Sequence, residues 1–158
     1  MPRTRSMIAT LLGLTVLSGL TACSPAADPA DPVQLMVRDG VLRELGAECS
    51  GSSGYLYIHA GAKLVLRDDK GDDALDVILP VGTAVQADET DYGNAKRVPT
   101  VCVFTVDGSG LTEGANYEVF IDQKQEEDYL HDSSTQIDSV PTIAVPPLGV
   151  APDYSEEN

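Results

Sequence analysis

Three cysteines carry the clearest chemistry in this chain: Cys23, Cys49 and Cys102. A disulfide uses two thiols, so an odd number leaves one thiol over in an oxidising compartment. A redox centre is expected to place two cysteines in a C-x-x-C motif or to lower the pKa of one thiol, and no such motif is present. We therefore expect two of the thiols to have a structural role together and the third to have a separate role.

Cys23 is the thiol with a separate role. It ends the tetrapeptide Leu20-Thr21-Ala22-Cys23, in which a branched apolar residue and two small residues precede the cysteine. This tetrapeptide resembles the bacterial lipobox, where the thiol accepts a diacylglyceryl group. Ordinary cleavage after Ala22 is the alternative, but Leu20 is bulky where an A-x-A site has a small residue. With Cys23 assigned to lipid, Cys49 and Cys102 remain as a pair, and we expect a disulfide between them.

The residues before Cys23 have the layout of a signal peptide. Arg3 and Arg5 form a positive n-region, and an apolar region follows from Met7 to Leu20. Such a region is too short to span a bilayer as a helix. We therefore expect residues 1–22 to be removed, and lipid on Cys23 to hold the protein on the extracytoplasmic face of the cell membrane. Two acyl chains make a stable anchor.

Clustered carboxylates are the next candidates for chemistry. Five aspartates lie within nine residues: Asp68, Asp69, Asp72, Asp73 and Asp76. Calcium binds oxygen ligands on a looped backbone, but the position of Gly71 and the missing distal glutamate do not fit an EF-hand. We interpret the cluster, and the acids at 88, 89 and 91, as solvated turns.

Histidine and serine offer no catalytic arrangement. His59 lies in a strand pattern and His131 lies beside Asp132, whereas a zinc site needs three or four ligands. The Ser/Gly loop of residues 49–54 is not a G-x-S-x-G elbow. Tyr55, Tyr57 and Tyr92 are candidates for a small recognition patch or for the cover of a sheet edge. We expect no catalytic residue, no metal and no cofactor, and a protein that is not an enzyme.

The charge of the chain limits its partners. After the leader there are 8 basic and 25 acidic residues, a net charge of −17. Nucleic acid and anionic lipid headgroups are repelled by such a surface. The acids keep a tethered domain soluble, although a cationic partner or a divalent metal would also suit them. We expect a monomer that binds no nucleic acid, and an envelope protein as its possible partner.

Period-two alternation of apolar residues predicts β-strands over most of the chain. The predicted strands cover 33–38, 63–67, 74–79, 101–106 and 117–122. Residues 101–106 are apolar on both faces, as in a central strand. Gly-containing turns separate the runs. Residues 123–130 favour a hairpin over a helix. The fold expected is all-β, an immunoglobulin-like or prealbumin-like β-sandwich of six to eight strands.

Composition divides the chain into four parts. Residues 1–22 are the signal peptide, and 23–32 are the lipid anchor with a Pro-containing linker. The sandwich is expected to cover 33–132. Residues 133–158 form a Pro-rich acidic tail, because four prolines there disfavour both helix and interior strand. The apolar stretch 140–150 leaves two alternatives open for this tail, namely disorder or partial docking on the domain.

A loose motif runs through the domain: Cys49, then Gly54-Tyr55, Ile58 and Gly61, then Cys102-Val-Phe104-Thr-Val106 and Tyr117-Glu-Val119. It resembles small actinobacterial lipoproteins of unknown function over about residues 33–132. The resemblance implies a compact sandwich pinned between the two cysteines, and it carries no catalytic residue. The long acidic segment between Gly82 and Cys102 and the Pro-rich tail depart from it.

Three functions fit these observations. The first is a non-enzymatic, membrane-anchored module that binds an envelope protein or an extracellular ligand. The second is a metal-dependent envelope enzyme, or its accessory subunit, that uses the Asp-rich loops. The third is a structural or chaperone-like module outside the membrane. Metal dependence distinguishes the second function, and co-purification of a specific partner separates the first from the third.

Overall fold

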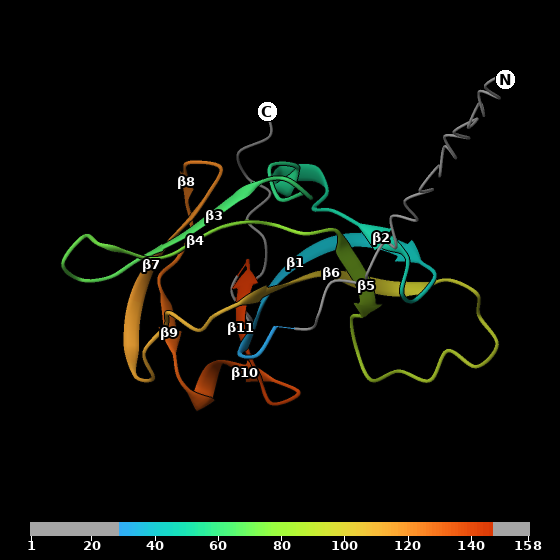
Figure 1. The fold of residues 1–158 in the computed structure, drawn as a ribbon. Helices are drawn as coiled ribbons and strands as arrows, with labels where there is room; N and C mark the ends of the chain where they lie inside the picture. The colour runs from blue at the N-terminus through green and yellow to red at the C-terminus, as the bar shows by residue number, and fades with distance from the viewer. Residues whose placement is uncertain (1–28, 147–158) are drawn as a thin grey trace, which may run out of the picture.

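The computed structural model describes residues 29–146 as two β-sheets packed face to face (Figure 1). The six-stranded sheet has the order β10-β11-β1-β6-β5-β2, and the five-stranded sheet has the order β4-β3-β7-β8 with β9 also paired to β7. The all-β sandwich predicted from the sequence is confirmed. The predicted signal peptide, Cys23 and residues 147–158 lie outside the described residues.

The first sheet contains β1 (Pro32–Arg43), β2 (Glu48–Cys49), β5 (Gly82–Gln86), β6 (Val98–Asp107), β10 (Gln136–Ile137) and β11 (Val140–Val145). The second contains β3 (Lys63–Arg67), β4 (Asp73–Ile78), β7 (Ala115–Ile121), β8 (Lys124–Gln125) and β9 (Tyr129–His131). Short 3-10 turns lie at η1 (Ser53–Tyr55) and η2 (Ser133–Thr135). Seven strands have five residues or more, within the predicted range, and four more have two or three.

Alternating side chains build the core between the sheets. In β3, Leu64 and Leu66 are buried, whereas their neighbours along the strand face outward. In β6, Cys102 and Phe104 point inward and are fully buried, as the shared strand face predicted. Because the chain has no Trp and only two Phe, the core consists mainly of Val, Leu and Ile, and Phe104 is the largest of its fully buried side chains in the described range.

The folded domain extends beyond the boundary predicted at residue 132. Strand β11 pairs in parallel with β1, from Gln34 opposite Thr142 to Val37 opposite Val145. The prolines counted against a strand here do not interrupt it, because pairing with β1 begins one residue after Pro141. The β-branched run that follows is well suited to a pleated sheet. Residues 136–145 are therefore part of the sandwich, and the predicted tail boundary is wrong.

Tight turns connect neighbouring strands of the second sheet. The hairpin predicted at residues 68–71 joins β3 to β4. The hairpin preferred over a helix at residues 123–130 is also present, since β7 and β8 are joined by Asp122 and Gln123, both at positive φ. Positive φ at both central residues matches the right-handed twist of the strands that they connect.

Candidate functional site

The disulfide between Cys49 and Cys102 is formed, with the two Cα atoms 5.7 Å apart. It connects β2 with β6, which are separated in the sheet by β5. Gly82 of β5 makes this possible, because a Cβ there would lie 2.6 Å from Cys102 Sγ and 2.8 Å from Phe104 Cε1. The bridge thus fastens the short edge strand to the centre of the sheet, and it depends on a glycine beneath it.

The five clustered aspartates have different roles in the structure. Asp68 accepts hydrogen bonds from the backbone N–H groups of Lys70 and Asp72, each at 2.9 Å. These hydrogen bonds lower the pKa of the Asp68 carboxyl. Asp73 and Asp76 instead form ion pairs across the sheet with Arg67 and Lys63, at 3.0 and 2.9 Å. Turn formation and surface ion pairing therefore use three of the five carboxylates.

Calcium should bind this loop only weakly. Within residues 29–146, no group of three or more His, Cys, Asp or Glu side chains is arranged to hold a metal ion. Asp68 Oδ1 already accepts two backbone N–H groups, which makes it a poorer ligand for a cation. We expect calorimetric titration of the metal-stripped domain to give no dissociation constant at or below about 10⁻⁵ M, the range of sensor sites. A tighter site that Asp68→Asn removes would contradict this prediction.

The second acidic loop, 88–91, is also organised as a turn. Asp88 accepts hydrogen bonds from the backbone of Thr90 and from the hydroxyl of Tyr92, the latter at 2.8 Å. Together these lower the pKa of Asp88. Asp91 accepts from the backbone N–H of Gly93 at 2.8 Å. The Tyr92 hydroxyl therefore stabilises the loop in which it lies.

The two histidines do not form a common site. His59 lies in the loop before β3, not in a strand as its sequence pattern indicated, and its Nε2 is 3.9 Å from Asp122 Oδ2. His131 is buried in β9, where its Nδ1 lies 2.8 Å from the Tyr129 hydroxyl. Burial raises the pKa of Tyr129, so its hydroxyl stays protonated at neutral pH. This pair supports the edge of the second sheet.

Tyr57 belongs to a contact that the sequence did not indicate. Its hydroxyl donates to Glu126 and accepts from Lys124 Nζ at 2.8 Å, while that ammonium lies 4.2 Å from the ring centroid. Burial, followed by the hydrogen bond to Glu126, raises the pKa of Tyr57. A neutral tyrosine therefore ties the loop after η1 to the β7–β8 hairpin. Residues 69 positions apart meet here, so local sequence carries no signal of it.

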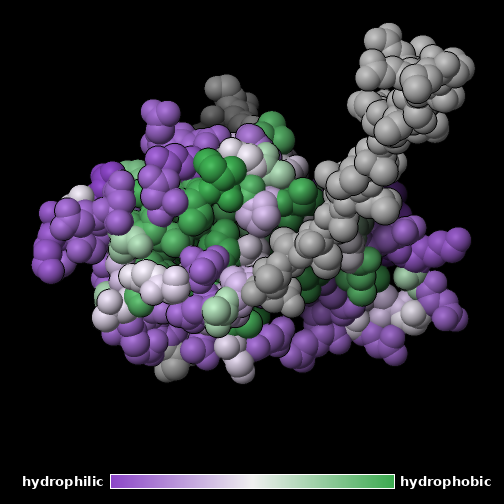
Figure 2. Space-filling model, in the orientation of Figure 1, coloured by the Kyte–Doolittle hydropathy of each residue, from purple (hydrophilic) through white to green (hydrophobic). Residues whose placement is uncertain are grey.

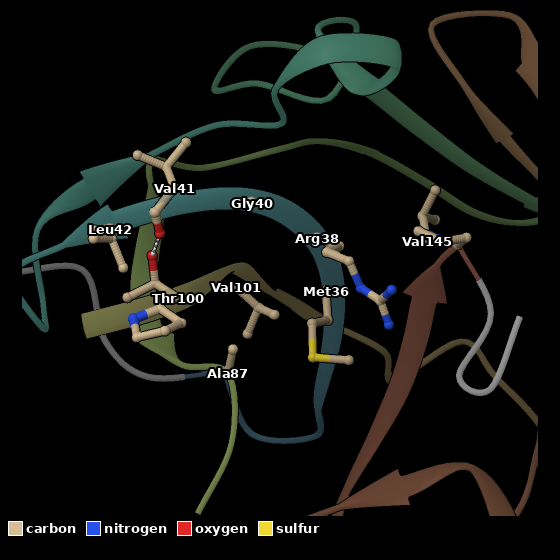
Figure 3. Close-up of a pocket in the computed structure, with 11 residues that line it drawn as sticks. Met36, Arg38, Gly40, Val41, Leu42, Ala87, Thr100, Val101 and Val145 are labelled. Carbon is tan, nitrogen blue, oxygen red and sulfur yellow. Dashed lines mark hydrogen bonds between the residues drawn. The ribbon is translucent and has the colours of Figure 1, made fainter. Parts of the chain in front are cut away.

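An apolar groove of about 460 Å³ lies on the outer face of the six-stranded sheet. Figure 3 shows Met36 of β1, Val101 of β6 and Ala87 after β5 pointing toward one another across it. The end of β11 forms another wall. Among the eleven residues with described side chains that line this groove, Arg38 is the only charged one.

A break in the β1–β6 pairing shapes the groove. The register shifts between Arg38 and Leu42, where Gly40 has a φ of +64°. Thr100 Oγ1 donates to the carbonyl of Val41 at 3.2 Å, so the bulge is held in place (Figure 3). Bulges re-aim the side chains beside them. Here the bulge leaves Leu42, which is 53% exposed, at the rim of the groove.

Apolar surface continues beyond the groove. Val85 of β5, 43% exposed, is the register partner of Val101. Figure 2 draws the molecule from another side than Figure 3; on this side apolar side chains gather near the centre, and hydrophilic side chains gather at the β3–β4 turn on the left and the β5–β6 loop at lower right. The sequence held a signal for the groove: β6 is apolar on both faces, and a two-layer sandwich covers only one face of each sheet.

No family model, curated protein or solved structure matches the chain. Within residues 29–146, no helix is long and apolar enough to cross a membrane. The groove is therefore interpreted from its own chemistry: a recessed, uncharged surface with one guanidinium at its edge, on a domain whose surface is otherwise rich in acids.

Proposed function

We propose that this protein is a lipid-anchored lipoprotein of the bacterial envelope whose β-sandwich acts by binding another envelope protein. The observation that carries the binding role is the groove. Contiguous apolar recesses with few polar groups are typical of recognition sites. The disulfide supports an extracytoplasmic location, since such bonds persist in oxidising compartments. The same disulfide in an all-β domain supports the resemblance to small actinobacterial lipoproteins.

The proposed anchor sets where the domain works. Pro32, the first residue of β1, lies nine positions after Cys23 in the chain. A fully extended chain of this length spans about 30 Å. The domain would therefore meet partners close to the membrane that holds it. Lipid on Cys23 supplies the only attraction to the bilayer in this proposal, because the acidic domain is repelled by anionic headgroups.

The charge of the domain indicates what charge the partner's contact surface carries. The basic side chains of the five-stranded sheet are largely neutralised, with Lys63, Arg67 and Lys124 in ion pairs with acids. The excess of acids leaves the domain as a whole with a negative charge. A partner with a basic or neutral contact surface and an uncharged apolar segment fits both features. Screening limits the charge term to about 8 Å at physiological salt, so it acts on contact formation.

Changing Cys23 to Ser should release the protein from the membrane. We expect the unchanged chain to incorporate labelled palmitate and to sediment with membranes, and Cys23→Ser to do neither. The serine hydroxyl does not replace the thiol as acceptor of the diacylglyceryl group. Cys49→Ser is the matched control, because it removes a different thiol and should still incorporate the label. Incorporation of label by Cys23→Ser would contradict the proposed anchor.

The binding role is tested by crosslinking in intact cells. A photoreactive residue in place of Val85, beside the groove, should capture a specific protein. Val101→Asp should abolish capture, since it places a carboxylate among apolar walls, whereas Thr105→Asp should retain it. Thr105 is exposed on the same face of β6 but does not line the groove.

Two further results decide the details of this proposal. Affinity for the captured partner should fall as salt rises, and an affinity that is unchanged or increases would remove the electrostatic part. If Val101→Asp and Thr105→Asp capture the partner equally well, the groove is not the binding surface. Metal-dependent hydrolysis of an envelope substrate by the purified protein would replace the binding function with an enzymatic one.

A further inference from the structure

The end of the described chain lies at the groove itself. Val145 and Pro146 are among the residues that line it. Twelve residues follow Pro146 in the sequence. Fully extended, a segment of this length spans about 40 Å, more than enough to cross a recess lined by three strands and a loop.

These twelve residues have a two-part composition. The first six, Pro-Leu-Gly-Val-Ala-Pro, carry no charge and include Leu148 and Val150. The last six contain three acids, Asp153, Glu156 and Glu157. The groove beside their starting point combines apolar walls with one basic residue, Arg38, whose side chain lies between Met36 and Val145 in Figure 3.

Basic residues gather at this end of the six-stranded sheet. Arg38 lines the groove, is exposed, and forms no ion pair with any residue in the described range. Arg43 pairs in register with Val98, directly after Lys96 and Arg97 in the chain. Four of the eight bases beyond the leader thus lie on β1 or just before β6.

We propose that residues 147–152 occupy the groove and that the carboxylates after them pair with Arg38 and its basic neighbours. The chain's own C-terminal segment then competes with the partner for the same surface. Competition rests on the proposed function, whereas occupancy does not. A short tether gives an effective concentration in the millimolar range, so an intrinsic dissociation constant of about 1 mM is enough for substantial occupancy. An external partner must therefore displace the segment.

Met36 provides a direct reporter of occupancy. It lines the groove, and it is the only methionine after the leader. In protein covering residues 24–158, labelled at methionine methyl groups, its NMR signal should differ from that of protein ending at Pro146. Both forms retain all eleven strands. A Met36→Leu variant assigns the signal. Leu148→Asp in the longer form should move the signal to the position seen in the shorter form.

A synthetic peptide of residues 147–158 completes the test. Added to the shorter form, it should shift the Met36 signal toward its position in the longer form, and a scrambled peptide should not. Arg38→Gln should weaken this binding several-fold. Identical Met36 signals in the two forms, or equal effects of the two peptides, would overturn the proposal.

A difference between the two forms that depends on protein concentration would also overturn the proposal, because it would assign the groove to a second copy of the chain. None of these results alters partner capture by the shorter form, so failure of this inference is separate from failure of the proposed function. If the inference holds, the shorter form should capture the partner more strongly than the longer one.

Discussion

Protein that ends at Asp132 should lose its cooperative unfolding transition, while protein that ends at Pro146 should keep it. The shorter form lacks β10 and β11, and with them the buried side chains Ile143 and Val145, which are 4% and 3% exposed. Burial of one such side chain contributes about 1.5–3 kcal/mol, and loss of the strand also uncovers the edge of β1. The sum approaches the 5–15 kcal/mol that stabilises an ordinary domain.

Urea denaturation followed by circular dichroism measures this difference. Two variants within the full chain separate loss of packing from loss of chain length. Ile143→Ala should lower the free energy of unfolding by about 2–5 kcal/mol. Ala144→Ser, on the outer face of the same strand, should change it by less than about 0.5 kcal/mol. A sharp transition of unchanged midpoint in protein that ends at Asp132 would show that β11 is dispensable.

Replacing both Cys49 and Cys102 with Ala should lower the free energy of unfolding by about 4 kcal/mol, because the bridge closes a loop of more than fifty residues in the unfolded chain. Reduction of the unchanged protein should have a similar effect, since both treatments free the same loop. Urea titration with and without reductant measures it. In the double variant, reductant should have no effect, which controls for other actions of the reagent.

Gly82→Ala tests the packing beneath the bridge separately from the bridge itself. The added methyl group would lie 2.6 Å from Cys102 Sγ and 2.8 Å from the carbonyl oxygen of Cys49. Overpacking of this kind costs about 1–3 kcal/mol, and the cost should be present while the disulfide is intact. Equal stability of Gly82→Ala and the unchanged protein would mean that the edge strand adjusts freely around the disulfide.

The parts of the fold that were predicted correctly depend on local patterns. Alternation in residues 63–67 and 117–122 reports directly which side of a strand is buried, and the Asp-Asp-Lys-Gly turn at residues 68–71 has few alternatives. The disulfide followed from counting thiols once Cys23 had been set apart. For Cys102, its position on the face shared with Phe104 also indicated that it points inward.

The parts that were missed depend on contacts between distant residues. Proline content hid β11, because composition over a window does not reveal that Pro141 and Pro146 only bracket the part of the strand that pairs with β1. The groove needs a bulge in β1, the loop after β5 and the end of β11 in one place. His59 was placed in a strand because a short polar-apolar alternation resembles one. No local pattern distinguishes such a loop from an edge strand.

The parallel pairing of β1 with β11 has a mechanical consequence. The two strands run side by side in the same direction, so the start of β1 and the end of β11 lie at opposite ends of the pair. For a domain held by lipid before β1, a pull on the C-terminal end would act along both strands in opposite directions. Such a pull shears several hydrogen bonds at once, whereas pulling a hairpin apart from its open end breaks them one after another. Force between the membrane and a molecule bound to the C-terminal end would therefore load the β1–β11 pair in shear, the direction in which paired strands resist separation most.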